Sequence, residues 1–486
     1  MNAAELILVA LVLPILAAVG IALAGKLPNL REGITLVTAL VLFACVAQLL
    51  DPVLAGMRPE FVLLEPLPGL PIAFRVEPLG MLFALIASGL WIVNSVYSIG
   101  YMRGNKEKNQ TRFYVCFALS IAAALAIAFA ANLLTLFLFY EVLTLITYPL
   151  VTHAGTDKAR RGGRTYLAIL MGTSVLFLLP AVIYTWHVAG TTEFRPGGIL
   201  PAGMETGTLM VLLALFMFGI GKAALMPFHR WLPAAMVAPT PVSALLHAVA
   251  VVKAGVFSVV KVIVYVFGLD QLAGATDWLI GIAGFSIVAA SVVALNADNL
   301  KRRLAYSTVS QLSYVTLAAA ILAPLSVAGA ALHIAAHAFG KITLFFAAGA
   351  IYTAAHKTEV SQLDGIGRRM PWTMAAFGIG ALSMIGLPPA AGFVSKWYIV
   401  SGAFAQAQWF ALAVIFISTL LNAGYFLPIL YRAFFRPLSA EAAAHPHGEA
   451  PLAIVIALTF TAAGTLALFF FPDVPLALAQ QLVKSP

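Results

Sequence analysis

Residues 134–151 read LTLFLFYEVLTLITYPLV, an apolar stretch of membrane length with one glutamate, Glu141, near its middle. A helix needs about 20 apolar residues to cross the hydrocarbon core of a bilayer. Four lysines lie in other apolar runs in the same way, namely Lys222, Lys253, Lys341 and Lys396. A charge at that depth costs at least about 2.5 kcal/mol and usually belongs to an ion or proton path. We therefore expect these five side chains to carry the function.

The composition predicts an all-α, polytopic integral membrane protein. Hydrophobic residues make up 62% of the 486 positions and charged residues only 10%, which lies outside the range of soluble domains. Glu5, in place of a basic segment before the first apolar run, favours a retained helix over a cleaved signal peptide. Apolar runs predict about 14 transmembrane helices, at residues 4–25, 32–50, 79–100, 112–131, 132–151, 165–187, 207–229, 240–264, 276–297, 303–322, 326–352, 372–403, 408–431 and 451–472.

The positive charges predict the orientation of this bundle. Loops on one side carry 19 of the 28 Lys and Arg residues, and the other side carries only Arg58, Arg75, Arg195, Lys261 and Lys484. Cytoplasmic loops are enriched in Lys and Arg, so both termini are expected outside. The net charge of +9 follows from this bias, and it gives little support to nucleic-acid binding.

Two predicted helices are broken beside a lysine. In GIGKAALMPFHRWLPAAM, residues 219–236, Pro227 cannot donate to the carbonyl of Ala223, which lies beside Lys222. In MIGLPPAAGFVSKWYIV, residues 384–400, Pro388 and Pro389 free the carbonyls of Met384 and Ile385, upstream of Lys396.

The two breaks predict an internal repeat. A shift of five helices relates helix 7 to helix 12, and an odd shift inverts the second copy. We therefore expect helices 4–8 and 9–13 to form inverted five-helix repeats, an architecture that places ion sites at broken helices near the membrane midplane. The expected parts are residues 1–110 with helices 1–3, residues 111–266 and 267–434 with the two repeats, and residues 435–486 with helix 14.

No cofactor is expected in this chain. The two cysteines, Cys45 and Cys116, fall in apolar runs, so neither a disulfide framework nor an iron–sulfur or other metal ligand set is available. GIGK at residues 219–222 is not a phosphate loop, because that motif needs glycine where Phe216 stands and Ser or Thr where Ala223 stands. Redox chemistry, if any, belongs to partners, and whether the complex is an enzyme stays open.

Glu141 and Lys222 are predicted to act as a pair. Burial favours the neutral form of a carboxyl group and a nearby ammonium favours the charged form, so a Glu–Lys pair can be switched by changing its separation. A lysine in a dry interior exchanges its proton more readily than one in water. The alternatives for Glu141 are a protonated carboxyl bonded within the bundle and one partner of a structural ion pair.

Residues 332–346, LHIAAHAFGKITLFF, place His333, His337 and Lys341 at i, i+4 and i+8. Along a helix these positions drift only about 80° while climbing about 12 Å. Histidine titrates near neutrality and can relay protons, so this polar stripe is interpreted as part of a proton wire. The alternatives are histidines bonded to carbonyls between helices, and a metal site, for which no third ligand is evident.

Residues 240–257, TPVSALLHAVAVVKAGVF, add a second group of candidates. Ser243 and His247 share one helix face, where they can hold a water, and Lys253 lies on another. Lys253 and Lys396 are nearer to helix ends than Lys222, so snorkelling to the interface is the alternative for these two lysines.

These motifs carry a resemblance to a known family. The stretches WLPAAMVAPTPVSALLH, RRLAYSTVSQLSYV, HAFGKITLFFAAGAI and GLPPAAGFVSKWYIV are similar to the antiporter-like subunits of Mrp-type multisubunit antiporters, membrane-bound hydrogenases and respiratory complex I. GFVSKWYIV and NAGYFLPILYRAFF most resemble the D-type subunits of Mrp antiporters. The resemblance implies that proton transfer falls on Glu141, Lys222, His247, Lys253, His333, His337, Lys341 and Lys396. One departure is that His247, typical of the larger complex-I-type subunits, occurs together with the D-type Lys253.

Two functions follow from the resemblance. The first is a proton-translocating subunit of a sodium/proton antiporter in a prokaryotic cell membrane, and the alternative is the membrane arm of a redox-driven pump. A weaker third interpretation is a structural subunit whose charges are inert ion pairs. The resemblance implies other membrane subunits, protons and sodium as partners, and no nucleic acid.

Overall fold

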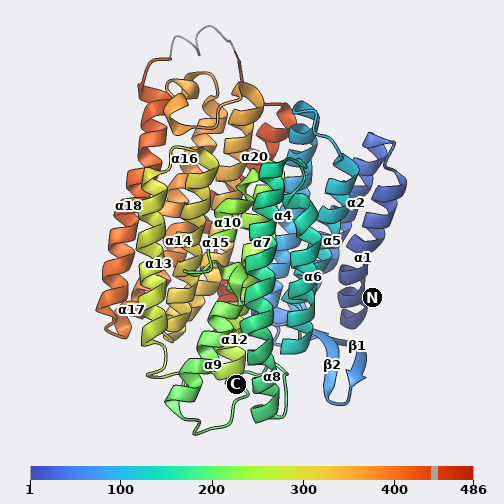
Figure 1. The fold of residues 1–486 in the computed structure, drawn as a ribbon, viewed down its shortest axis with the longest axis vertical. Helices are drawn as coiled ribbons and strands as arrows, with labels where there is room; N and C mark the ends of the chain where they lie inside the picture. The colour runs from blue at the N-terminus through green and yellow to red at the C-terminus, as the bar shows by residue number, and fades with distance from the viewer. Residues whose placement is uncertain (1, 439–446, 485–486) are drawn as a thin grey trace.

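The computed structural model describes residues 2–438 and 447–484, which form a bundle of long helices with one small hairpin (Figure 1). The long unbroken helices are α1 Ala3–Leu23, α2 Pro28–Ala47, α4 Pro78–Gly104, α5 Gln110–Ala128, α6 Leu133–Val151, α13 Asp277–Asn296, α14 Leu300–Ala320, α15 Pro324–Ala355, α18 Trp409–Phe435 and α20 Leu452–Phe470. Two further spans pass through π-helical turns, α7 Asp157–Thr173 with α8 Leu179–Ala189, and α11 Thr240–Ala244 with α12 Val251–Val262. This all-α, multi-pass architecture confirms the predicted fold class.

Eleven helices of the described residues are each long and apolar enough to cross a membrane. Of the predicted spans, the two broken helices and α14 fall outside this group. In α14 the cause is a row of buried polar residues, Ser307, Thr308, Ser310, Gln311 and Ser313. A helix with so many buried polar groups needs partners inside the bundle, so α14 is placed for the interior rather than for lipid.

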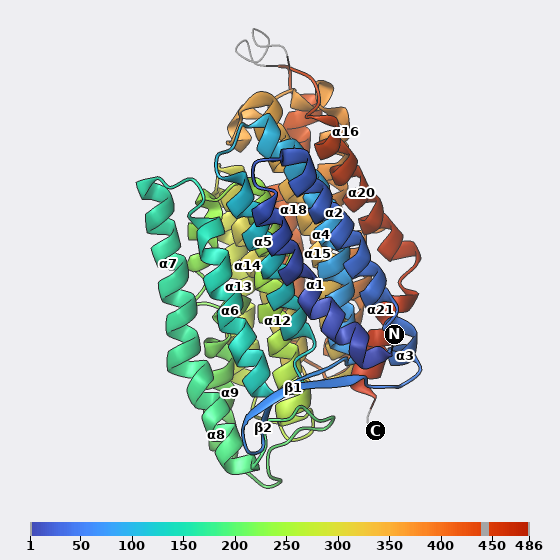
Figure 2. The ribbon, with the colours of Figure 1, turned by 90° about the vertical axis from the view of Figure 1, so that its right-hand side faces the viewer.

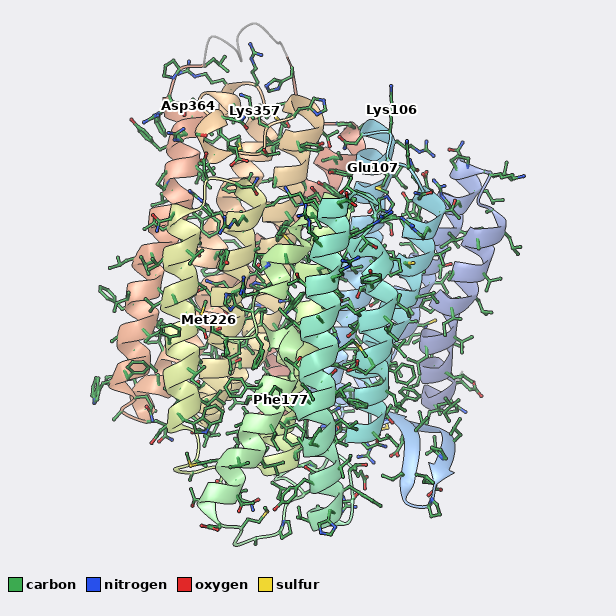
Figure 3. The ribbon with its side chains drawn as sticks, viewed as in Figure 1. Lys106, Glu107, Phe177, Met226, Lys357 and Asp364 are labelled. Atoms are coloured by element: carbon green, nitrogen blue, oxygen red, sulfur yellow. The ribbon has the colours of Figure 1, made fainter. Side chains whose placement is uncertain are left out.

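Both helix breaks are present. The first helix consists of α9 Thr206–Gly219, a 3₁₀ turn Gly221–Ala223 and α10 Trp231–Ala234. The second consists of α16 Pro371–Ile385 and α17 Ala391–Ala405, which meet at Gly386 with a φ of +92°. In Figure 3 the labelled Met226, three residues beyond the 3₁₀ turn, lies at about mid-height of the bundle. The breaks therefore lie where the sequence predicted them, although α9 ends at Gly219 and not at Pro227.

Four short elements were not predicted. Strands β1 Glu60–Leu67 and β2 Leu70–Arg75 pair antiparallel within the expected loop 51–78. Short helices α3 Leu50–Leu54 and α21 Asp473–Val483 follow α2 and α20. Figure 2 shows both chain ends toward the end of the bundle that carries the hairpin. The two termini thus share one side, and the prediction that this side is the outside stays a prediction.

Gly255 on α12 sets how closely this helix approaches the first break. A Cβ atom at position 255 would meet the main chain of Lys222 and Ala223. Only glycine allows two backbones to lie so near, so Gly255 helps to hold the 3₁₀ turn that presents Lys222.

We expect Gly255→Ala to lower the melting temperature of the detergent-solubilised protein, because such overpacking costs about 1–3 kcal/mol. The matched control is Gly281→Ala on α13, where a Cβ atom meets nothing within 4 Å and alanine favours the helix. Equal melting temperatures for the two variants would contradict the close approach.

Candidate functional site

The ammonium of Lys222 is fully buried and bound to α6. Its Nζ donates to the carbonyl of Tyr140 at 2.7 Å and to Oγ1 of Thr144 at 2.5 Å, and it lies 3.2 Å from the centre of the Tyr140 ring. The backbone N–H of Lys222 donates to the Tyr140 hydroxyl at 2.9 Å. The Trp231 indole donates to the carbonyl of Gly221 at 2.9 Å. The break is therefore held against one turn of α6, and the carbonyl bound by Lys222 is that of Tyr140 rather than the one that Pro227 leaves without a donor.

Glu141 is the neighbour of Tyr140 in sequence, but its carboxylate is not an acceptor of the Lys222 ammonium. Both carboxylate oxygens are buried and have no hydrogen-bond partner among the described residues. The flanking Leu138 and Leu145 are 37% and 54% exposed, so Glu141 lies on a face of α6 at the surface of this chain. Lys222 thus binds the turn of α6 that carries Glu141, but the two charged groups of the predicted pair are not in direct contact.

His247 lies in the π-helical turn that precedes α12. Its Nδ1 is 3.0 Å from Oγ1 of Thr308 on α14, and its ring centre is 4.5 Å from that of Phe345. Its Nε2 is buried without a partner among the described residues. The hydroxyl of Ser243 bonds to the carbonyl of Pro239 at 3.5 Å, so the contact of His247 is with Thr308 rather than with the predicted Ser243.

Lys253 joins α12 to α15. Its Nζ lies 2.6 Å from Nδ1 of His337, and both side chains are buried. This contact joins Lys253, the candidate on predicted helix 8, to His337, a member of the predicted stripe on helix 11. Lys253 does not snorkel, because none of its surface is exposed.

The stripe on α15 is buried along its length, but its members bond to different helices. His333 places Nδ1 2.8 Å from Oγ of Ser395 and Nε2 3.0 Å from Oε1 of Gln311. The rings of His333 and His337 have centres 6.2 Å apart. Lys341 donates to Oγ of Ser307 at 2.7 Å and to the carbonyl of Leu304 at 3.2 Å.

Lys396 uses both carbonyls that the second break frees. Its Nζ donates to Met384 at 2.9 Å and to Ile385 at 3.0 Å. These are the carbonyls that Pro388 and Pro389 leave without donors. The ammonium also lies 4.6 Å from the centre of the Tyr314 ring. The side chain is directed inward, so the snorkelling alternative fails for Lys396 as well.

Neutral polar residues that the sequence analysis did not single out connect Lys341 to Lys396. The Tyr425 hydroxyl of α18 donates to Oγ of Ser307 at 3.0 Å and makes a short hydrogen bond with Asn422. Both Asn422 and Gln311 donate to the carbonyl of Met384, at 3.3 and 3.2 Å. The signal for these residues is the polar sequence of α14 and the isolated amide of Asn422 in an apolar helix. Together they form one hydrogen-bonded network around the second break.

A cavity of about 860 Å³ opens at the end of the bundle opposite the hairpin, where Figure 3 labels Glu107. Its charged lining residues are mainly basic, including Lys158, Arg230 and Lys301, with Glu107 as the acidic member. Burial raises the pKa of the Glu107 carboxyl above its ordinary value, and nearby Lys301 opposes this shift. Thr240, at the start of α11, also lines the cavity, which therefore reaches the helix that leads to His247.

The packing corrects the assignment of Lys261. Lys261 was counted among loop charges of the outer side, and this is wrong, because it lies in α12, is fully buried and forms an ion pair with Glu77 at 3.0 Å. The two cysteines are free. Among residues 2–438 and 447–484, no group of three His, Cys, Asp or Glu side chains is placed to hold a metal ion.

Known proteins share this architecture. Residues 130–422 match the family model described as NADH:quinone oxidoreductase/Mrp antiporter, TM. NADH-quinone oxidoreductase subunit N of Desulforudis audaxviator (strain MP104C) is 33% identical over 371 residues, which cover 76% of this chain and 74% of the relative. A probable K(+)/H(+) antiporter subunit of Rhizobium meliloti (strain 1021) is 31% identical over 335 residues, which cover 68% of this chain but only 32% of the relative.

Two solved structures share the fold over nearly the whole chain. A chain of the archaeal membrane-bound sulfane sulfur reductase has a TM-score of 0.86 and 21% identity, covering 99% of this chain and 98% of that chain. A chain of the Mrp complex from Dietzia sp. DQ12-45-1b has a TM-score of 0.83 and 20% identity, covering 98% and 97%. At such identities the likeness concerns the fold. With the sequence matches, it shows that this chain belongs to the NADH:quinone oxidoreductase/Mrp antiporter transmembrane family.

Proposed function

We propose that this chain is the proton-translocating subunit of a multisubunit monovalent cation/proton antiporter, with sodium as the exchanged cation. The observation that carries the proposal is the row of buried titratable side chains from Lys222 through Lys253 and the α15 stripe to Lys396. Ionisable residues inside a membrane protein are expensive and are kept for ion or proton transfer. Structural ion pairs do not explain this row, because its lysines bind neutral acceptors.

Lysines and histidines serve as the stations of the proposed path. Lys253 and His337 lie 2.6 Å apart, within direct proton-transfer distance. The 6.2 Å between the centres of the His337 and His333 rings is a distance that a water or a ring movement must bridge. Ser307 and Tyr425 supply hydroxyl groups beside Lys341. The side-chain amides of Asn422 and Gln311 orient the groups to which they are hydrogen-bonded. His247 takes up protons from the side of the 860 Å³ cavity, whose basic rim we assign to the cytoplasm.

Glu141 supports the existence of a partner subunit. The carboxyl oxygens of Glu141 are buried and have no hydrogen-bond partner among the described residues, which is unfavourable, and the leucines beside Glu141 on the same helix face are exposed. We therefore infer that another membrane subunit covers this face of α6. In that position Glu141 passes protons or charge between the neighbour and Lys222, which binds the turn of α6 that carries Glu141.

The alternative is the membrane arm of a redox-driven pump, as the quinone oxidoreductase relative and the sulfane sulfur reductase chain suggest. The buried path serves either function, because the driving force lies in neighbouring subunits. The experiment is to isolate the complex in mild detergent, identify the co-purified chains, and assay everted vesicles for collapse of a pH gradient on addition of NaCl. Small membrane subunits with sodium-dependent collapse support the antiporter, whereas an iron–sulfur protein without such collapse supports the pump.

We expect Glu141→Gln and Lys222→Ala each to reduce proton transport in everted vesicles at least tenfold while the complex stays assembled. One change removes the carboxyl group on this turn of α6, and the other removes the ammonium that binds the turn. Glu205→Gln, at an exposed position before α9, is the control and should retain the wild-type rate. If transport and assembly are lost together, the two residues form a structural pair and the proposed role is wrong.

Replacing members of the α15 stripe should impair transport to different degrees. Lys341→Ala removes an ammonium that binds α14 through Ser307 and Leu304, and we expect a loss of at least tenfold. His337→Ala leaves Lys253 and His333 in place, and we expect a partial loss. His356→Ala, at the exposed end of the same helix, is the matched control. Full activity of both test variants in the vesicle assay would place the path elsewhere.

A further inference from the structure

A second buried Glu–Lys pair lies outside the path described above. Lys261, on α12, has no exposed surface, and Glu77, immediately before α4, is 4% exposed. The Lys261 Nζ lies 3.0 Å from Oε2 of Glu77 and donates to the carbonyl of Ala130 at 2.7 Å. This oxygen of Glu77 has the ion pair but no hydrogen-bond donor among the described residues. Lys261 follows Lys253 by eight positions, which is about 12 Å of helical rise.

Three chain segments cover this pair at the hairpin end of the bundle, and we call them the outer plug: residues 73–75, residues 129–132 and residues 192–194. Main-chain hydrogen bonds join them, from Arg75 to Phe129 at 2.6 Å, from Ala131 to Ala73 at 3.0 Å and from Phe194 to Ala131 at 3.0 Å. The carbonyl of Ala130 that binds Lys261 belongs to the plug. In Figure 1 the hairpin strands lie at this lower end, beside the start of α6.

The surface on the solvent side of the plug is charged and partly exposed. Arg75 forms ion pairs with Glu60 at 2.9 Å and with Glu193 at 2.5 Å, and Arg195 pairs with Glu193 at 2.8 Å. The centres of the Phe194, Phe257 and Tyr265 rings lie 4.5, 5.4 and 5.9 Å from the Lys261 ammonium. Phe194 and the carbonyl of Ala130 belong to the plug, so the plug lies directly against the buried pair.

Stability alone is a poor reason to keep such a pair. Removing two charges from water costs several kcal/mol, and apolar replacements of similar volume are often neutral or stabilising. Titratable groups buried in a membrane protein are usually functional. The pair also differs from the other buried lysines, because here the ammonium faces a carboxylate, which can accept its proton.

We infer that Glu77 and Lys261 form the outer proton-release site of the first half of the path, with the outer plug as its gate. The inference rests on the proposed proton transport. In the step, the Lys261 ammonium gives one proton to the Glu77 carboxylate, which leaves a neutral amine and a neutral carboxylic acid. When the plug opens, the acid releases that proton to outer water, and the amine is reprotonated from the side of Lys253.

Lys261→Arg separates this role from a structural one. A guanidinium keeps the positive charge and pairs with a carboxylate at least as well as an ammonium, but it does not release its proton under working conditions. A structural ion pair therefore tolerates the change, whereas a release site does not. We expect proton transport in everted vesicles to fall at least tenfold in the assembled Lys261→Arg complex.

A second variant covers the case in which arginine does not fit. Glu77→Gln keeps the shape of the side chain and removes the proton acceptor, and it should likewise cut transport at least tenfold with the complex assembled. Glu205→Gln, at an exposed position outside the plug, is the control and should retain transport. Wild-type transport in either assembled test variant would overturn the inference.

The result is distinguishable from a failure of the proposed function. Lys222→Ala is assayed in the same membranes as a reference. If Lys222→Ala abolishes transport while Lys261→Arg and Glu77→Gln do not, protons move through the chain but leave by another route. If the wild-type complex moves no protons, the proposed function itself is wrong.

Discussion

The arrangement of this protein depends on how its buried ammonium groups find hydrogen-bond acceptors within the helix bundle. In a membrane interior every polar group needs a partner from the protein. Lys222, Lys341 and Lys396 find theirs in backbone carbonyls and hydroxyls, from α6, α14 and the end of α16 respectively. Neutral acceptors hold an ammonium in place without the full attraction of a carboxylate. A lysine held this way keeps a defined position and can still give up its proton.

At each of the two helix breaks, a buried lysine is held by such neutral acceptors. At the second break, two prolines free two carbonyls and the lysine of the same broken helix occupies both. At the first break, the lysine lies in the broken segment itself and reaches the neighbouring α6. Each of the two lysines thus lies beside a helix break, but they bind different acceptors. An internal repeat whose copies have diverged would produce this pattern. The four-part division of the chain stays a prediction.

Much of this organisation was predictable from sequence, and the failures have physical causes. Apolar length and proline placement located the spans and both breaks, because the bilayer and the missing N–H act locally on the chain. Spacing on one helix identified the α15 stripe. The contacts from Lys253 to His337 and from Lys222 to Tyr140 join residues 84 and 82 positions apart, so no local pattern contains them. Neutral members such as Asn422 and Gln311 give a weaker signal than the lysines, because a neutral amide costs less to bury than a charge. Lys261 was counted with the charges of the outer side because it lies near the end of the predicted helix 240–264, and only the fold shows that it pairs with Glu77.

The central claim is that one continuous path joins the two halves of the chain, and Lys253 is its junction because it alone links α12 to the α15 stripe by a side-chain contact in the described residues. The most direct measurement is proton uptake by liposomes that contain the purified complex and an entrapped pH dye, with wild type compared to Lys253→Met. Methionine keeps most of the side-chain volume and removes the titratable group. The account predicts uptake at the level of empty liposomes with all subunits still present. Uptake at the wild-type rate would show that protons do not pass from one half to the other through this residue.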